Sequence, residues 1–472
     1  MASSSLKILE VCQISPATNP AESSTTEFTL PVTFLDTLWF KFPPVERIFF
    51  YQLSESESAP IFFNSVILPH LKQSLSQTLI HFLPLTGHLT WSLSSPKPII
   101  SYTQNDSVSV TVAEAVNIDF DNLSGNDFHK CTESHLCIPE LPVSDTKASI
   151  IALQITLFPK KGFSIGIINH HAILDGKSTT MFMKAWAFIS KNSKLEPRSS
   201  PYPLPDNLKP FFNREVIKDV AELEMVYLNQ WLAISNKDSE PESNPRSLKV
   251  WNKPGAETDL VYAIFELTRE DIKRLRETAS FYSERIKSTY VSSFVLTCAY
   301  TFVCMVKAKK ADPNRKIYFV FSVDLRTRLD PPVPENYVGN CVSSYDIAIE
   351  ARSLMEENGV AVMAEKINSR IKGLADKGVF EGARDFIPRM IDVEPGTQVV
   401  GVAGSTRFGV YESDFGWGRP KKVETTSVDR TGSIALAESR DGNGGVEIGI
   451  AFIKPEMEVF ASLFANGIKD LY

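Results

Sequence analysis

Apolar runs broken by turn residues predict a β-hairpin in the first half of the chain. Residues 150–158 read Ile-Ile-Ala-Leu-Gln-Ile-Thr-Leu-Phe, and residues 163–169 form a second, mostly apolar run. Between them, residues 159–162 read Pro-Lys-Lys-Gly. Two apolar runs around a short Gly-containing turn are typical of paired antiparallel strands. We therefore expect two adjacent strands, with the second ending just before His170 and His171.

Helices are predicted on either side of the middle of the chain. Ser178 precedes apolar residues spaced as on one helix face, and we expect it to cap that helix. Thr268 and Asp271 resemble a capping box, although Asp replaces the usual Glu. Residues 291–306 are apolar on most sides, which predicts a buried helix.

The second half of the chain also contains strand patterns. Residues 317–323 are apolar apart from Ser322, as in a buried strand. Residues 433–438 and 446–453 flank a turn rich in Gly and predict another hairpin, followed by a C-terminal helix. Strands and helices occur in both halves, so the fold class is expected to be mixed α/β.

The middle of the chain has the composition of a linker between domains. Residues 196–210 are rich in Pro and Ser, and residues 236–258 are polar with three Pro. These stretches bracket a short helical segment and resemble an interdomain crossover. We expect an N-terminal domain at 1–210, a linker at 211–258 and a C-terminal domain at 259–472.

Composition narrows the function classes. The net charge of −7 argues against a nucleic-acid-binding protein, which usually carries a basic face, but it allows an anionic ligand. The N-terminus lacks the apolar run of a signal peptide, and the longest apolar stretch, 291–306, is shorter than the ~20 residues of a spanning helix. We expect a cytoplasmic protein without membrane association. None of the six Cys forms a C-x-x-C pair, so we expect reduced thiols and no metal site.

One motif is misleading. Residues 162–166 match G-x-S-x-G, the nucleophile elbow of α/β hydrolases. That motif places its Ser at a strand-to-helix turn, with an acid and then a His downstream. Here Ser164 lies inside a predicted strand, and no acid stands between it and the His residues that follow. The serine-hydrolase interpretation is therefore disfavoured.

The candidate catalytic residue is His171. It begins an H-x-x-x-D pattern with Asp175, followed by Gly176, and no His occurs later in the chain. Such a pattern also arises by chance, and a structural His at the end of a strand is the alternative interpretation. A neutral imidazole on a rigid strand end suits a general base. If the strand continues that far, His170 points to the opposite face, so only one of the pair should reach a cleft.

A second motif lies near the C-terminus, where residues 414–418 read Asp-Phe-Gly-Trp-Gly. Gly416 and Gly418 allow a tight turn, and the rings of Phe415 and Trp417 can pack beside it. Asp414 is the one titrating group in the motif. These features indicate a structural role.

Together these motifs resemble the BAHD acyltransferases of plants, whose hallmarks are H-x-x-x-D-G and D-F-G-W-G. Both stand intact here, 243 positions apart, and residues 30–36 and 83–89 also resemble family segments. The resemblance implies two domains like those of chloramphenicol acetyltransferase. Each would have a mixed β-sheet with flanking helices, and a long crossover loop would join them. A segment of the second domain is expected to cross back to the first.

A finer resemblance is to the subgroup that acylates sugar hydroxyls of anthocyanin, flavonoid and phenolic glucosides. That subgroup carries Y-F-G-N-C, and residues 337–341 here read Tyr-Val-Gly-Asn-Cys, with Val338 departing from it; residues 404–408 also resemble the subgroup. The implied function is transfer of an acyl group, with malonyl favoured, from acyl-CoA to a sugar hydroxyl. A hydroxycinnamoyl donor is the alternative, and a non-catalytic ligand-binding paralogue is the alternative of another class.

The resemblance also implies roles for individual residues. His171 would be the general base, Asp175 would pair with Arg326 to hold the loop, and Asp414, Gly416 and Trp417 would be structural. Residues expected to bind coenzyme A open a predicted helix, and they are Lys287, Ser288 and Thr289. Residues expected at the acyl or acceptor pocket are Asn340, Lys177 and Arg407, the two cations being alternatives for a donor carboxylate. The small-molecule partners would be acyl-CoA and the glycoside, bound by a monomer with no permanently bound cofactor.

Overall fold

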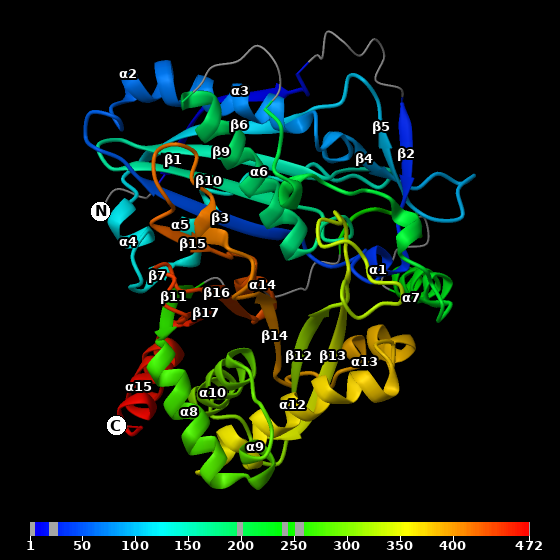
Figure 1. Cartoon of the computed structure of the whole chain (residues 1–472), viewed down its shortest axis with the longest axis vertical. Helices are drawn as coiled ribbons and strands as arrows, with labels where there is room; N and C mark the ends of the chain where they lie inside the picture. Colours follow the sequence, from blue (N-terminus) through cyan, green and yellow to red (C-terminus); the bar gives the residue numbers. More distant parts are fainter. Residues whose placement is uncertain (1–4, 18–26, 196–201, 238–243, 251–258, 472) are drawn as a thin grey trace.

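Two large mixed sheets form the frame of the molecule. The computed structural model describes residues 5–17, 27–195, 202–237, 244–250 and 259–471. One sheet, with its helices, occupies the upper part of Figure 1, and the other lies below it. The strand order is β1-β6-β9-β10-β3-β15 in the upper sheet and β13-β12-β14-β16-β17-β11-β7 in the lower sheet. The predicted mixed α/β class is confirmed.

The upper sheet contains the predicted hairpin. Its strands are β1 (Ser5–Ile14), β3 (Val45–Gln52), β6 (Val108–Val116), β9 (Ile151–Phe158), β10 (Gly162–Asn169) and β15 (Lys422–Glu424). Neighbouring strands are antiparallel except β6 and β9, which are parallel. Both strands of the hairpin, β9 and β10, are buried along their full length. Ser164 is in β10, as expected for a residue that is not a nucleophile at a turn.

The lower sheet confirms the strands predicted in the second half. Its members are β7 (His129–Lys130), β11 (Leu260–Leu267), β12 (Lys316–Asp324), β13 (Val342–Glu350), β14 (Val399–Gly404), β16 (Ile434–Glu438) and β17 (Val446–Ile453). Strands β12, β14 and β16 run parallel to one another, and the other pairs are antiparallel. A third, small sheet holds β2 (Phe28–Pro31), β4 (His88–Thr90), β5 (Ile99–Tyr102) and β8 (Lys147–Ser149).

Helices cover the sheets. The upper part carries α1 (Phe34–Thr37), α2 (Pro60–Phe62), α3 (Leu68–Leu79), α4 (Phe120–Leu123), α5 (Cys131–His135) and α6 (Gly176–Leu195), with α7 (Leu223–Lys237) from the linker. The lower part carries α8 (Arg269–Tyr282), α9 (Glu284–Lys287), α10 (Ser293–Ala308), α11 (Arg352–Met355), α12 (Gly359–Lys377), α13 (Phe386–Ile391), α14 (Val428–Thr431) and α15 (Lys454–Lys469). The predicted capping box of Thr268 and Asp271 opens α8.

Each sheet has its own hydrophobic core. The first core packs β9 and β10 against α3 and α6, and includes the fully buried Trp186. The second core surrounds α10, which is buried on nearly all sides as its apolar sequence predicts. Within the described ranges, none of the helices combines the length and the apolar character needed to cross a bilayer.

The two sheets exchange strands. β15 comes from the second half of the chain and pairs with β3 at the edge of the upper sheet. β7 comes from the first half and pairs with β11 at the edge of the lower sheet. The first exchange brings a segment of the second half to the upper sheet, and the second exchange was not foreseen from the sequence. The halves are therefore joined by backbone hydrogen bonds in both directions.

Buried charges accompany this exchange. Glu424 of β15 lies 3.1 Å from the imidazole of His129 in β7 and 2.8 Å from the amine of Lys422. Burial would raise the pKa of Glu424, but the charges of Lys422 and His129 outweigh it and lower the pKa to about 2. The Lys422 amine also donates to the carbonyl oxygen of Leu123, at 2.8 Å. Removing one partner of such a group would leave an uncompensated buried charge.

A second ion-pair cluster lies nearby and involves His135. Its Nε2 lies 2.6 Å from Asp429, in α14, and its Nδ1 lies 3.4 Å from Glu46, in β3. Burial would lower the pKa of His135, but hydrogen bonds and charges from Asp429 and Glu46 outweigh it and raise the pKa to about 9. The protonated imidazole thus joins an element of the second half to the upper sheet.

This cluster predicts that stability falls as the pH rises. The folded-state pKa of His135 lies above the unfolded value of about 6.5, so its contribution is complete below pH 6.5 and is lost as the pH rises through 9. The expected loss of unfolding free energy over this window is about 3 kcal/mol. Chemical denaturation of wild type at several pH values should show it. His135→Gln should flatten the decline, whereas His70→Gln, outside the cluster, should retain it. An equal decline in His135→Gln and wild type would contradict the assignment.

Candidate active site

The loop between β10 and α6 presents His171. β10 ends at Asn169, and His170 follows with its side chain fully buried, whereas His171 is partly exposed. The backbone N–H of His170 donates to the carbonyl of Ile150, and its ring accepts from the N–H of Ala172. His170 thus anchors the loop, and one imidazole of the pair is accessible, although the strand does not continue to these residues as the alternation argument required.

Aromatic rings surround the imidazole of His171. The indole of Trp39 stacks on it at 4.3 Å between ring centroids, with an interplanar angle of 3°. Phe42 lies edge-on at 6.3 Å. Nδ1 of His171 is buried with no partner outside its own residue, whereas Nε2 is not among the buried, unpartnered atoms of the described chain. Nε2 is therefore the nitrogen that a substrate can reach.

Burial sets the protonation state of this imidazole. It lowers the pKa of His171 to about 4, a shift that the residue's own backbone carbonyl and the charge of Asp175 only partly offset. At neutral pH the ring is therefore uncharged. A neutral imidazole has one nitrogen that accepts a proton, as a general base requires.

Asp175 faces away from His171 and is used structurally. Its Oδ1 accepts a hydrogen bond from the N–H of Ser178, at 2.7 Å, in the manner of an N-cap. Its Oδ2 accepts from the Arg326 guanidinium at 2.9 Å and from the N–H of Cys341 at 3.2 Å. The prediction that Ser178 caps the helix was wrong: α6 begins at Gly176, and the carboxylate of Asp175 takes the capping position.

The predicted ion pair between Asp175 and Arg326 is present. The Arg326 guanidinium is fully buried, and besides Asp175 it contacts Asp324 at 3.0 Å and the carbonyl of Tyr337 at 3.1 Å. Burial raises the pKa of Asp175, but the charge of Arg326 and the hydrogen bonds of Ser178 outweigh it and lower the pKa. The pair joins the His171 loop to the end of β12 in the other sheet.

Asn340 does not line a pocket, contrary to expectation. Its side chain is fully buried, and its Nδ2 donates to the carbonyl of His171 at 2.9 Å and to Asp36 Oδ1 at 3.1 Å. The backbone N–H of Asn340 also donates to Asp36, at 3.0 Å. Asn340 therefore fixes the backbone of His171, and Asp36 fixes Asn340.

Residues before β3 complete the surroundings of His171, and the sequence prediction missed them. Thr33 and Asp36 form a capping box that opens α1, and Trp39 follows directly. The T-x-x-D spacing of the capping box could have identified this helix start. No local signal could have shown that it lies beside His171, because about 130 residues separate the two in the chain.

The motif at 414–418 is structural, as its composition indicated. Asp414 Oδ1 accepts from the N–H groups of Gly416 and Gly418 at 2.9 and 3.0 Å, and both Gly have φ near +97°. Asp414 also pairs with Lys191 of α6, at 2.7 Å. The Trp417 ring lies under the amine of Lys194, at 4.1 Å. The motif thus binds the second half of the chain to α6 rather than to the reacting groups.

Lys287, Ser288 and Thr289 do not open a helix. α9 ends at Lys287, and α10 begins only at Ser293, where Ser292 is the N-cap. Ser283 caps α9 and Ser292 caps α10, so the predicted single helix start at Lys287 does not occur. The three residues therefore offer no free helix N-terminal amides, and Lys287 pairs with Glu284 at 3.4 Å.

The two cations proposed for a donor carboxylate differ in their partners. Lys177 forms ion pairs with Glu335 and, at 3.6 Å, with Asp324. Arg407 is exposed and forms no ion pair with a described residue. The neighbouring Phe408 ring lies 2.8 Å from where a Cβ of Gly176 would be, so only Gly fits there. Arg407 therefore stands close to the start of α6.

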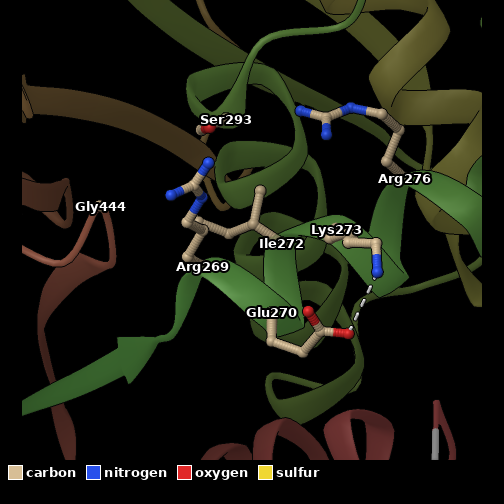
Figure 2. A pocket seen from close by; sticks show the side chains of 7 residues that line it. All are labelled: Arg269, Glu270, Ile272, Lys273, Arg276, Ser293 and Gly444. Carbon is tan, nitrogen blue, oxygen red and sulfur yellow. Dashed lines mark ion pairs between the residues drawn. The ribbon is translucent and has the colours of Figure 1, made fainter.

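A basic depression of about 490 Å³ lies in the lower part of the molecule (Figure 2). Its cations are Arg269, Lys273 and Arg276, spaced along one face of α8, with Glu270 as the acidic member. Lys273 and Glu270 form an ion pair at 3.6 Å. The start of α10 and the turn between β16 and β17 complete the wall. Across the described ranges, no group of three or more His, Cys, Asp or Glu is arranged to hold a metal ion.

Comparison with known proteins agrees with this geometry. A model of the Transferase family matches residues 12–466. A phenolic glucoside malonyltransferase of Arabidopsis thaliana is 43% identical over 99% of this chain and 98% of its own length. A malonyl-CoA:anthocyanidin 5-O-glucoside-6''-O-malonyltransferase and an agmatine coumaroyltransferase of the same plant are 41% and 38% identical, each over at least 98% of both chains.

Among solved structures, vinorine synthase superposes with a TM-score of 0.68 at 21% identity, covering 97% of this chain and 98% of that one. That likeness shows the fold, which is the expected pair of chloramphenicol-acetyltransferase-like domains. Full-length relatives at about 40% identity and the match to the family model agree with the paired motifs at His171 and Asp414. The chain therefore belongs to the BAHD acyltransferases of the Transferase family.

Proposed function

We propose that this enzyme transfers a malonyl group from malonyl-CoA to a sugar hydroxyl of a phenolic, flavonoid or anthocyanin glucoside. The observation that carries the acyl-transfer step is the accessible Nε2 of a neutral His171, held beside Trp39. The malonyl donor and the glucoside acceptor are supported by the relatives, two of which are named for this chemistry.

In the proposed reaction His171 acts first as a general base and then as a general acid. Nε2 removes the proton from the acceptor hydroxyl, and the oxygen attacks the carbonyl carbon of the thioester. The C–S bond of the tetrahedral intermediate then breaks, and the proton on Nε2 passes to the departing sulfur. The products are the ester and coenzyme A, and no acyl-enzyme or metal is needed because a thioester is already activated.

The charged ends of the donor have candidate partners. Arg407 is our candidate for the malonyl carboxylate, because it lies near the start of α6 with no ion pair of its own, whereas Lys177 is already paired with two carboxylates. The depression lined by Arg269, Lys273 and Arg276 is a candidate for phosphate groups, since its lining carries three cations and a single carboxylate. We prefer this site to Lys287, Ser288 and Thr289, which do not open a helix.

A panel of donors and acceptors tests the proposal. Malonyl-, acetyl- and coumaroyl-CoA are each incubated with several phenolic glucosides and with their aglycones, and the products are identified by mass. We expect malonylated glucosides as the main products and none from the aglycones, which lack the sugar hydroxyls. Acylated aglycones would contradict the acceptor assignment, and a preference for coumaroyl-CoA would favour the hydroxycinnamoyl alternative, for which the agmatine coumaroyltransferase is a precedent.

The same panel tests the cation. Arg407→Met should lower the ratio of malonyl to acetyl transfer about tenfold, because only the malonyl donor loses a charge-assisted hydrogen bond. Lys177→Met is the matched control, and its ratio should stay close to that of wild type. An unchanged ratio in Arg407→Met would remove Arg407 from the donor site.

A further inference from the structure

His171 must carry a positive charge during the reaction, and among the residues that the structure describes no carboxylate around it lacks other partners. Asp175 is the nearest, but both of its oxygens are engaged by Arg326, Ser178 and Cys341. Asp36 binds Thr33 and Asn340 and lies 3.8 Å from Arg214. An imidazolium formed at His171 therefore has no described carboxylate in direct contact with it.

The other charged and titratable groups packed around the loop add no negative charge. His170 is buried, and burial together with the neighbouring His171 lowers its pKa to about 4, so it is neutral at neutral pH. Lys41 is buried on the same segment as Trp39, and its amine donates to the carbonyls of Ser247 and Lys249. Neither neighbour supplies a negative charge that could balance an imidazolium at His171.

Trp39 is placed to compensate. Its indole is stacked on the imidazole, with an interplanar angle of 3° and 4.3 Å between the ring centroids. The negative π face therefore covers the ring where charge develops. The side chain is nine-tenths buried, which keeps water from screening the contact. Indole is the strongest cation–π partner among the side chains.

The position of Trp39 is also held firmly. Trp231 of α7 donates from its indole N–H to the carbonyl of Thr37, at 3.0 Å. Trp231 also packs edge-on against Phe42, at 6.0 Å, and Phe42 packs edge-on against Trp39, at 5.0 Å. The linker helix thus supports the segment that carries Trp39, and the stack does not depend on exposed residues.

We propose that Trp39 is a positioning residue that holds the plane of His171 and stabilises the imidazolium through its π face. Trp39 acts through His171 and need not contact either substrate. The inference rests on the proposed function in which His171 is the base. It predicts that the strength of the π face, rather than the volume of the side chain, sets the rate and the proton affinity of His171.

Two substitutions separate these properties. We expect kcat to fall about 3-fold in Trp39→Phe, which keeps a weaker π face, and about 10- to 30-fold in Trp39→Leu, which keeps apolar bulk alone. The pKa of His171, read by NMR titration of labelled His without substrate, should fall in the same order. Trp91→Phe and Trp91→Leu are matched controls, because Trp91 is also buried in the first core but packs edge-on against Phe40 instead. Both controls should keep the wild-type pKa of His171.

Fluorinated tryptophan provides a test that preserves shape. Incorporation throughout the chain weakens every indole π face, so it should lower kcat and the pKa of His171 in wild type but change neither in Trp39→Phe. Equal kcat in the Phe and Leu variants, an unchanged or raised pKa in Trp39→Leu, or equal fluorination effects in wild type and Trp39→Phe would each overturn the proposal. The titration needs no turnover, so an inactive wild type with the expected pKa order would refute the proposed function and leave the stacking role supported.

Discussion

Replacing His171 by alanine is expected to lower kcat by about 1,000-fold, with the KM for both substrates changed only a few-fold. General acid–base catalysis contributes on the order of 10²–10⁴ to a rate, and Nε2 of His171 is the accessible imidazole nitrogen of the loop. The measurement is steady-state turnover of the best pair from the donor and acceptor panel. Because the imidazole is partly exposed, its removal should leave the fold intact.

A control and a contrary outcome sharpen this experiment. His81→Gln alters a half-buried His that bonds to the carbonyl of Tyr202, far from the loop in sequence, and should keep activity close to wild type. If His171→Ala retained a tenth or more of wild-type kcat, His171 would not be the base. Binding of donor and acceptor by the wild type without any turnover would instead support the interpretation of a non-catalytic ligand-binding protein.

Removing the charge of Asp175 is expected to destabilise the protein by about 3–5 kcal/mol, the usual cost of breaking a buried pair. In Asp175→Asn the fully buried guanidinium of Arg326 keeps Asp324, whose side chain is half exposed, as its remaining carboxylate partner among the described residues. Denaturant unfolding of the variant measures the change. Activity per folded molecule should fall less than in His171→Ala, because Asp175 touches no reacting group.

The double variant Asp175→Asn/Arg326→Met tests whether the pair is a unit. Removing both charges leaves no uncompensated ion, so the double variant should be more stable than the sum of the single losses predicts. Arg326→Met alone is the second arm of the cycle. Strictly additive losses would show that the two residues do not interact energetically, despite the distance of 2.9 Å.

The sequence was informative wherever a structural signal is local. Alternation and turn residues predicted the hairpin of β9 and β10, and a capping box predicted the start of α8. The ion pair of Asp175 and Arg326 was also predicted, but from the family resemblance, since no local pattern joins positions that far apart.

The failures have physical causes as well. Ser178 was expected to cap α6, but the helix begins at Gly176, and the carboxylate of Asp175 caps it by accepting the N–H of Ser178. The assignment of Lys287 to Thr289 to a helix start was wrong. Ser283 and Ser292 cap two separate helices, so these three residues lie at the end of the first helix and in the link to the second. β7 and β15 are two and three residues long, too short for any periodicity to register.

Contacts across the chain were the least predictable part of the site. Trp39 stacks on His171, and Asp36 binds the Asn340 that fixes it, because β3 and β10 pair in the upper sheet and place the segment before β3 beside the loop after β10. Asn340 was expected in a pocket because motif resemblance locates a residue along the chain but does not show which way its side chain faces.

The exchange of β7 and β15 has a consequence for how such enzymes diverge. Each half of the chain supplies the edge strand of the other half's sheet, together with buried partners such as Glu424 and His129. A gene fusion that joins the first half of one relative to the second half of another would inherit two mismatched edges at once. Substrate preferences within this architecture are therefore expected to evolve through loops around a jointly inherited frame, and not through the shuffling of halves.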